Sequence, residues 1–123
     1  MGLLQLEAEC EIYFKNNWTL TDIQLPNKVF DYDNKTSWIA LSFNPTINQR
    51  MSSDRILYNG LSSVFCYHEE KKLALKLADD VESFFNCKEL PFDIRVDIAQ
   101  FKPPIDLDIG FWEVKVNFEV TQY

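Results

Sequence analysis

The feature that most constrains the fold of this sequence is a strict two-residue alternation near its C-terminal end, from Phe111 to Tyr123. Apolar and polar side chains alternate there: Trp112, Val114, Val116, Phe118 and Val120 are interleaved with Glu113, Lys115, Asn117 and Glu119. Successive side chains of a β-strand point to opposite faces of a sheet. The segment 111–123 therefore predicts a strand of an antiparallel sheet that has one buried and one hydrated face.

Other segments extend this predicted sheet. Residues 92–101 show the same alternation, and residues 37–44 are apolar on both faces, which is typical of a central strand. A short strand is expected near residues 18–23. Residues 55–67 predict a long strand, in which Gly60 would permit a β-bulge.

Two segments have helical periodicity, residues 3–16 and residues 69–85. The first apolar stripe consists of Leu4, Ala8 and Ile12, and the second of Leu73, Ala74, Leu77, Ala78, Val81, Phe84 and Phe85. Glu69 and Glu70 are expected in the first turn of the second helix, where negative charge favours the helix dipole. Both stripes predict helices that pack on the sheet.

The order helix, strands, helix, strands predicts an α+β protein. We expect a two-layer sandwich, in which a mixed, mostly antiparallel β-sheet carries two α-helices packed on one face. A chain of 123 residues has the usual size of one domain, so residues 1–123 are expected to form a single unit.

The charge balance argues against a protein that grips nucleic acid. There are 19 acidic and 12 basic residues, which gives a net charge of −7. The densest basic cluster is Lys71, Lys72 and Lys76, and it lies beside Glu69 and Glu70. A polyanion-binding surface needs a continuous basic stripe, because neutralisation of phosphates supplies most of the affinity.

The cysteines predict reduced thiols rather than a disulfide framework or a zinc site. Cys10, Cys66 and Cys87 are odd in number, and no two of them form a Cys-x-x-Cys pair.

The longest uncharged run, residues 36–49, is polar and contains Pro45, so no membrane span is expected. These features are typical of a protein that matures in a reducing cytoplasm.

No reaction centre is evident in the sequence, so we expect no catalytic residue, cofactor or metal. His68 is the single histidine, and its neighbour Cys66 has no orienting group or oxyanion donor at a matching spacing. Glycine-rich phosphate loops are absent. A small metal-dependent hydrolase that uses Asp106, Asp108 and His68 remains an open alternative.

Two predicted loops carry apolar side chains and are the candidate interaction sites. The first spans residues 45–54 and the second residues 102–110. The candidates are Ile47, Asn48, Arg50 and Met51 in the first loop, and Pro103, Pro104 and Ile105 in the second. Such loops either bury these side chains on a partner or fold back on the edge of the sheet, and both alternatives are open.

The succession of elements resembles the tail terminator proteins of long-tailed bacteriophages and a group of related small phage proteins. No single motif carries the resemblance, which covers nearly the whole chain. Its parts are Phe14-Lys15-Asn16-Asn17-Trp18, Pro26-Asn27-Lys28-Val29-Phe30-Asp31, a strand opened by Trp38, the long strand 55–67, the helix around residues 73–79, and a last strand opened by Phe111-Trp112.

This resemblance implies a non-enzymatic α+β subunit that assembles as a ring, typically a hexamer, on the last ring of a tail tube protein. The ring would stop tube polymerisation and join the tail to a head-completion or connector protein, at the head-proximal end of a virion assembled in the bacterial cytoplasm. DNA would pass through an acidic lumen without specific binding. A neck or tail-completion adaptor is the alternative. We assign the first loop, with Arg50 and Met51, to the tube contact, and the second, with Pro103 and Pro104, to the seam between subunits.

Overall fold

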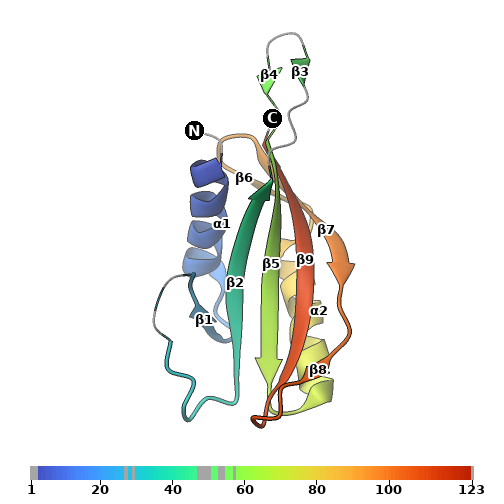
Figure 1. Ribbon diagram of the computed structural model, residues 1–123. Helices are drawn as coiled ribbons and strands as arrows, with labels where there is room; N and C mark the ends of the chain where they lie inside the picture. Colours follow the sequence, from blue (N-terminus) through green and yellow to red (C-terminus); the bar gives the residue numbers. More distant parts are fainter. Residues whose placement is uncertain are drawn as a thin grey trace.

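The computed structural model describes residues 3–26, 28, 30–46, 51–52, 55–56 and 58–122. In chain order, its elements are α1 (Leu3–Asn17), β1 (Asp22–Gln24), β2 (Ser37–Thr46), β3 (Met51–Ser52), β4 (Arg55–Ile56), β5 (Tyr58–His68), α2 (Lys71–Phe85), β6 (Lys88–Leu90), β7 (Ile94–Phe101), β8 (Ile105–Asp106) and β9 (Trp112–Gln122) (Figure 1).

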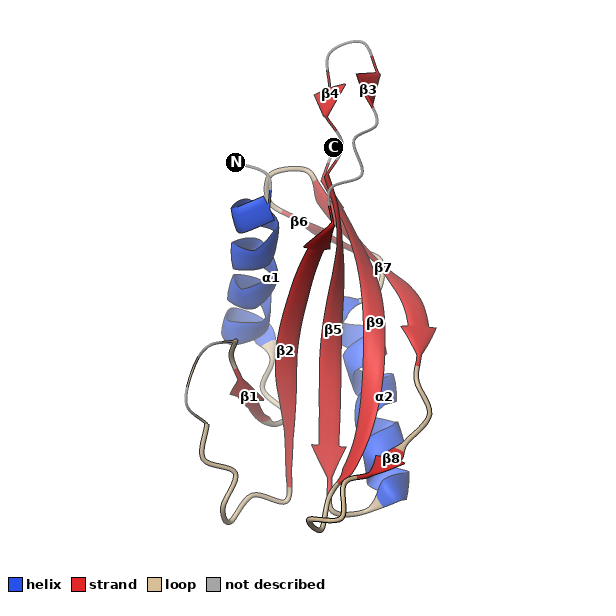
Figure 2. Cartoon of the chain, viewed as in Figure 1, coloured by secondary structure: helices blue, strands red, loops and turns tan. Residues whose placement is uncertain are grey.

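One mixed sheet organises the molecule. Its strand order is β1-β2-β5-β9-β7-β6, and β8 also pairs with β9. The pairing of β1 with β2 is parallel and the other ladders are antiparallel. The strands β3 and β4 form a separate two-stranded sheet. The α+β class is confirmed, and because the sheet is curled, a flat two-layer sandwich describes it only approximately (Figure 2).

Both helices pack against the same face of this sheet, as expected (Figure 2). The predicted alternation in β9 is confirmed, because Val114, Val116, Phe118 and Val120 all lie in the core. The helices contribute Cys10, Phe14, Ala74, Leu77, Ala78, Val81 and Phe85 to the same core. Removal of this apolar surface from water is the main free-energy gain of the fold.

The buried face of α1 differs from the predicted stripe. Ala8 and Ile12 are exposed, whereas Cys10 and Phe14 are buried. Cys10 and Phe14 lie four residues apart and so share a face of the helix. Because a phenylalanine ring buries more apolar area than an alanine, the helix turns Phe14 toward the core.

The apolar stripe predicted for α2 is confirmed except at Leu73, which is exposed, but the helix begins later than expected. Glu69 and Glu70 precede the helix rather than lying in its first turn, and Glu70 is the extended N-cap residue. The Glu69 N–H donates to the Thr36 carbonyl, and the Glu70 N–H donates to His68 Nδ1. These two bonds fix the junction between β5 and α2, where Glu70 is extended, and delay the start of the helix.

The ladder between β2 and β5 is longer than the sequence suggested. It continues through Pro45, which is opposite Gly60, so the loop predicted for residues 45–54 is partly strand. The predicted strand 55–67 is divided between β4 and β5. No bulge occurs at Gly60, where both ladders keep their register, and the irregularity lies in β7 between Ile98 and Gln100.

Several short elements were not predicted. β6 and β8 have three and two residues, too few for a periodic signal, and β8 places Ile105 in a strand rather than a loop. β7 begins at Ile94 rather than residue 92, because Phe92 and Asp93 have positive φ angles. The strand expected near residues 18–23 is β1, which begins at Asp22. Trp18 is not part of it, because its N–H donates to the Phe14 carbonyl of α1 and its ring is buried.

Candidate interaction surfaces

The three residues of the hydrolase alternative do not converge. His68 on β5 is opposite Trp112 on β9, and Trp112 is in turn opposite Asp106 on β8. His68 and Asp106 are therefore two strand spacings apart, roughly 10 Å. Asp106 Oδ1 accepts a bond of 3.0 Å from the Asp108 N–H, which closes a local turn. The described part of the chain holds no group of three potential metal ligands.

The buried cysteines are protected thiols. Burial raises the pKa of the Cys66 thiol, and the charge of Asp80 raises it further. Burial, together with the neighbouring glutamates of α1, raises the pKa of the Cys10 thiol to about 12. A thiol must ionise to act as a nucleophile, so neither side chain is activated at neutral pH. Cys87 is exposed and free, in the turn after α2.

The first group of predicted contact residues lies largely beyond what the structure describes. Ile47, Asn48 and Arg50 fall outside the described residues. Met51 opens β3 and is opposite Ile56 of β4. Figure 1 shows β3 and β4 beyond the ends of β2 and β5, away from both helices. The assignment of this segment to a tube contact stays a prediction.

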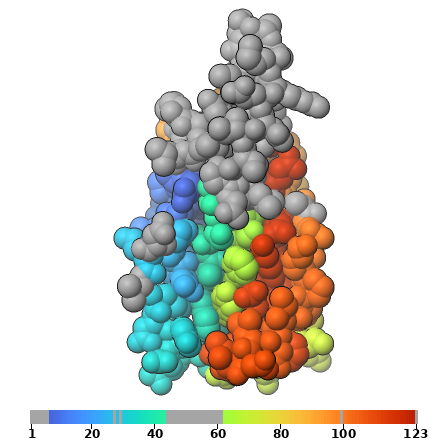
Figure 3. Space-filling model, viewed as in Figure 1, coloured from blue at the N-terminus to red at the C-terminus, as the bar shows by residue number. Residues whose placement is uncertain are grey.

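Pro103 and Pro104 of the second group lie between β7 and β8, and Ile105 opens β8. The strand β8 is at the end of the sheet away from the β3–β4 pair (Figure 1). Pro103 is exposed, Pro104 is half-buried and Ile105 is 52% exposed. The Lys102 N–H donates to the Lys115 carbonyl, which holds this segment against β9. Its backbone thus follows β9, and the side chains of Pro103 and Ile105 are exposed. In Figure 3 this orange segment forms part of the lower surface.

Exposed apolar side chains extend this second surface. Phe101 precedes the two prolines, and Ile109 follows β8. Both are exposed to a similar degree to Ile105. Several exposed apolar side chains within a short segment are typical of a surface that binds a partner. The subunit contact predicted for this segment stays a prediction.

The face of the sheet that the helices leave open is partly covered by loops of the same chain. The Trp38 ring is stacked on Tyr67, with centroids 4.7 Å apart, and on Tyr32, with centroids 5.5 Å apart. Phe111 meets Trp38 edge-on, and Trp38 is only 4% exposed. Burial raises the pKa of Tyr67, and the adjacent carboxylate of Glu113 raises it further. The cluster buries Trp38 and Phe111, and the sequence did not reveal it because its members come from two strands, β2 and β5, and from two separate loops.

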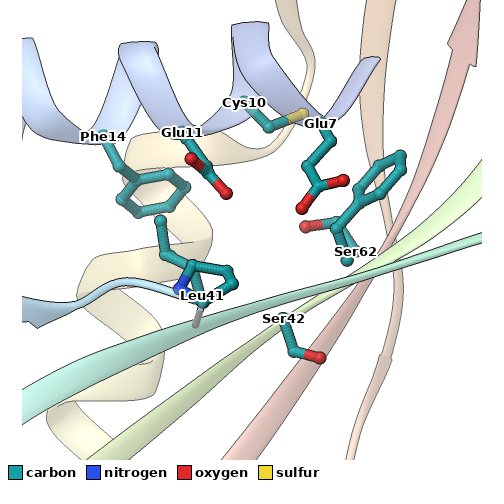
Figure 4. Close-up of a pocket in the computed structure, with 9 residues that line it drawn as sticks. Glu7, Cys10, Glu11, Phe14, Leu41, Ser42 and Ser62 are labelled. Carbon is teal, nitrogen blue, oxygen red and sulfur yellow. The ribbon is translucent and has the colours of Figure 1, made fainter. Parts of the chain in front are cut away.

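A crevice between α1 and β2 brings together acidic and apolar side chains. Its lining consists of Glu7, Cys10, Glu11 and Phe14 of α1, Pro26, Leu41, Ser42 and Phe43 of the β1–β2 region, and Ser62 of β5. Figure 4 shows the carboxylates of Glu7 and Glu11 pointing from the helix toward the sheet. Burial raises the pKa of Glu11, and the charge of Glu7 raises it further. Their four-residue spacing is the sequence signal that could have indicated a shared face.

Comparison with known proteins supports the fold class and gives no evidence on function. No family model matches the chain, and no curated protein matches it. One solved structure, whose name describes no function, is similar with a TM-score of 0.67 and 16% identity over 95% of this chain and 90% of its own. Such a likeness shows a shared α+β fold.

None of the described helices is long and apolar enough to cross a membrane.

Proposed function

We propose that this protein is a structural subunit of a bacteriophage tail. It assembles as a ring, expected to be a hexamer, on the last ring of the tail tube and ends tube polymerisation. The ring then presents a surface to the head-completion or connector protein, and DNA passes through its lumen without specific binding. In this proposal the curled sheet and its helices form the two-layer subunit of a tail terminator, at the head-proximal end of the virion.

The observation that carries the proposal is the position of the β3–β4 hairpin. The two strands lie beyond the sheet, on the side where β2 ends and β5 begins (Figure 1). An isolated two-stranded hairpin is only marginally stable in water. A hairpin in this position is suited to contact a neighbouring protein, as a subunit that caps a polymer requires.

A second surface lies at the other end of the subunit. Phe101 ends β7, Ile105 opens β8 and Ile109 follows β8, and all three side chains are exposed. The strand β8 lies at the end of the sheet away from the β3–β4 pair (Figure 1). A ring that joins a tube to a connector needs distinct contact surfaces, and heterologous contacts close into a ring when the rotation between copies closes. The arrangement of these two surfaces agrees with such a role, and so does the sequence resemblance.

The proposal is tested on phage particles assembled without this protein. Overlong tails that lack heads, seen by electron microscopy, are the expected result, because nothing then stops the tube. Tails of normal length joined to unfilled or leaking heads would contradict termination and indicate a neck adaptor. Native mass spectrometry of the purified protein over a range of concentrations gives the number of copies in the ring.

A further inference from the structure

The turn between β6 and β7 holds a bulky side chain in a backbone conformation that such residues rarely adopt. Leu90 pairs with Ile94, so the turn consists of residues 91–93. Phe92 and Asp93 have φ angles of 65° and 59°. Glycine, asparagine and aspartate adopt such left-handed angles far more readily than a bulky residue does, because the Cβ atom is crowded there. Phe92 is therefore the unfavourable residue of this turn.

The core of the subunit does not compensate for this conformation. The Phe92 side chain is 55% exposed. Among the described residues, it belongs neither to the core nor to the apolar side chains that pack against the core. Residues held in sparsely populated backbone regions persist where the surrounding structure fixes them, and they cluster at functional sites. An exposed aromatic ring in this conformation therefore indicates a role outside the subunit.

The backbone of the turn is fixed by the last strand of the sheet. Gln122 Nε2 on β9 donates to the Phe92 carbonyl over 3.1 Å. Gln122 is itself opposite Ile94 of β7 and Tyr58 of β5, so it lies within the sheet. A side chain that is presented from a fixed backbone loses less conformational entropy when it binds. The turn thus presents the Phe92 ring in a preorganised position.

This turn lies at the same end of the sheet as the β3–β4 pair. Gln122, which holds the turn, is opposite Tyr58, and Tyr58 opens β5 directly after the hairpin segment. Figure 1 shows the turn between β6 and β7 at this end, and β8 at the other. Phe92 therefore belongs to the end of the subunit that the proposed function assigns to the tail tube.

We propose that Phe92 is an anchor that inserts into an apolar pocket of the tail tube protein. Aromatic side chains that fill a pocket near the centre of an interface are typical of the few residues that carry most of the binding energy. The left-handed backbone aims the ring away from its own subunit, at the cost of some folding stability. This inference rests on the proposed function, in which the hairpin end of the subunit faces the tube.

Charge favours a partner whose pocket has a basic rim. Asp93 follows Phe92 directly and is exposed, and Glu89 on β6 is exposed as well. Arg95, the nearest basic residue after the turn, forms an ion pair with Asp97. A second copy of this chain, with its net charge of −7, would repel these carboxylates, whereas basic side chains around the pocket would attract them.

The test is the Phe92→Asn substitution in the full chain. Asparagine tolerates left-handed angles, so the purified variant is expected to melt about 3–6 °C above the wild type. In phage particles that carry this variant as their only copy, we expect overlong tails and a virion yield about tenfold lower, because the anchor is lost. A ring that only stabilises the turn predicts the opposite change in melting temperature. Calorimetry and electron microscopy measure the two effects.

Two control variants separate the ring from the backbone. Phe92→Tyr keeps an aromatic ring on the same backbone, and it is expected to melt and to cap tails nearly as the wild type does. Leu20→Asn removes a side chain that is 64% exposed, at a position without a positive φ angle. This variant is expected to show no rise in melting temperature and a normal virion yield.

Three outcomes overturn the inference. The first is a Phe92→Asn variant that gives tails of normal length and a normal virion yield. The second is a lower melting temperature of this variant, which would assign the ring a structural role. The third is normal tail length without attached heads, which would place Phe92 against the connector. Particles assembled without the protein test the proposed function separately, since tails of normal length there contradict it whatever the Phe92 variants show.

Discussion

The ring of Phe14 on α1 packs edge-on against the ring of Phe85 on α2, with centroids 4.7 Å apart and planes inclined at 60°. Both rings are almost fully buried, and Phe85 also meets Phe118 of β9. This contact joins the two helices to each other above the sheet. The contact therefore links residues that are far apart in the sequence. Phe85 belongs to the apolar stripe that the sequence predicts for α2, whereas Phe14 lies outside the stripe predicted for α1.

The Phe14→Ala substitution is expected to lower the free energy of unfolding by about 3–5 kcal/mol, because it removes a buried ring and leaves a cavity. Urea denaturation followed by circular dichroism measures this loss. The matched control is Ile12→Ala on the same helix, where the side chain is 46% exposed, and it should cost much less. Equal losses for the two variants would show that α1 does not pack as described.

A buried hydrogen bond joins β5 and β9 on the face opposite the helices. Ser63 Oγ donates to Asn117 Oδ1 over 2.8 Å, and both residues are buried. Ser63→Ala leaves the Asn117 carbonyl oxygen without this donor and is expected to cost about 1–3 kcal/mol. The control is Ser83→Ala on the exposed side of α2, which should cost nothing. Calorimetric melting distinguishes the two, and equal melting temperatures would contradict the pairing.

The three cysteines are expected to react with iodoacetamide at very different rates. Cys87 is exposed and should be labelled in the native protein at neutral pH. Burial and the raised pKa of Cys10 and Cys66 keep these thiols protonated, so they should be labelled only after denaturation. Mass spectrometry of proteolytic peptides measures each rate. Rapid native labelling of Cys66 would contradict its burial under α2.

Replacement of Glu11 by a neutral side chain is expected to stabilise the folded protein, by an amount that depends on pH. Its pKa is raised in the folded protein, first by burial and then by Glu7, so its ionisation opposes folding as pH rises above the ordinary range of glutamate. Glu11→Gln is therefore expected to melt at a higher temperature than the wild type at pH 7. The difference should shrink below the unfolded-state pKa of glutamate, where the wild-type carboxyl is protonated in both states. Thermal melts at pH 7 and pH 3.5 measure it, and a lower melting temperature of the variant at pH 7 would contradict this sign.

The Arg50→Ala/Met51→Ala variant tests the contact that the sequence assigned to the tube. It is expected to fold as the wild type does and to cap fewer tails, because side chains proposed to face the tube are removed. Electron microscopy of tails assembled with this variant measures tail length, and circular dichroism checks the fold. Normal tail length and virion yield would count against the assignment.

The fold class was predictable because it follows from local periodicity. The alternation in β9 and the apolar stripe of α2 each require one buried face, and together they specify an α+β protein. Short elements such as β6 and β8 give no periodic signal. The face that α1 buries also could not be predicted, since two apolar stripes compete on that helix and packing against Phe85 selects the one that contains Phe14.

The amino-acid sequence by itself determined the acidic charge, which follows from composition, and the two helices and the long strands, whose periodicity depends on neighbours within a few residues along the chain. Only the tertiary structure decided which residues meet. It brings Glu7 and Glu11 together with Ser62, more than fifty positions away, and it separates His68 from Asp106 by the width of β9. Contacts between distant segments depend on strand order and register, which side-chain periodicity does not specify.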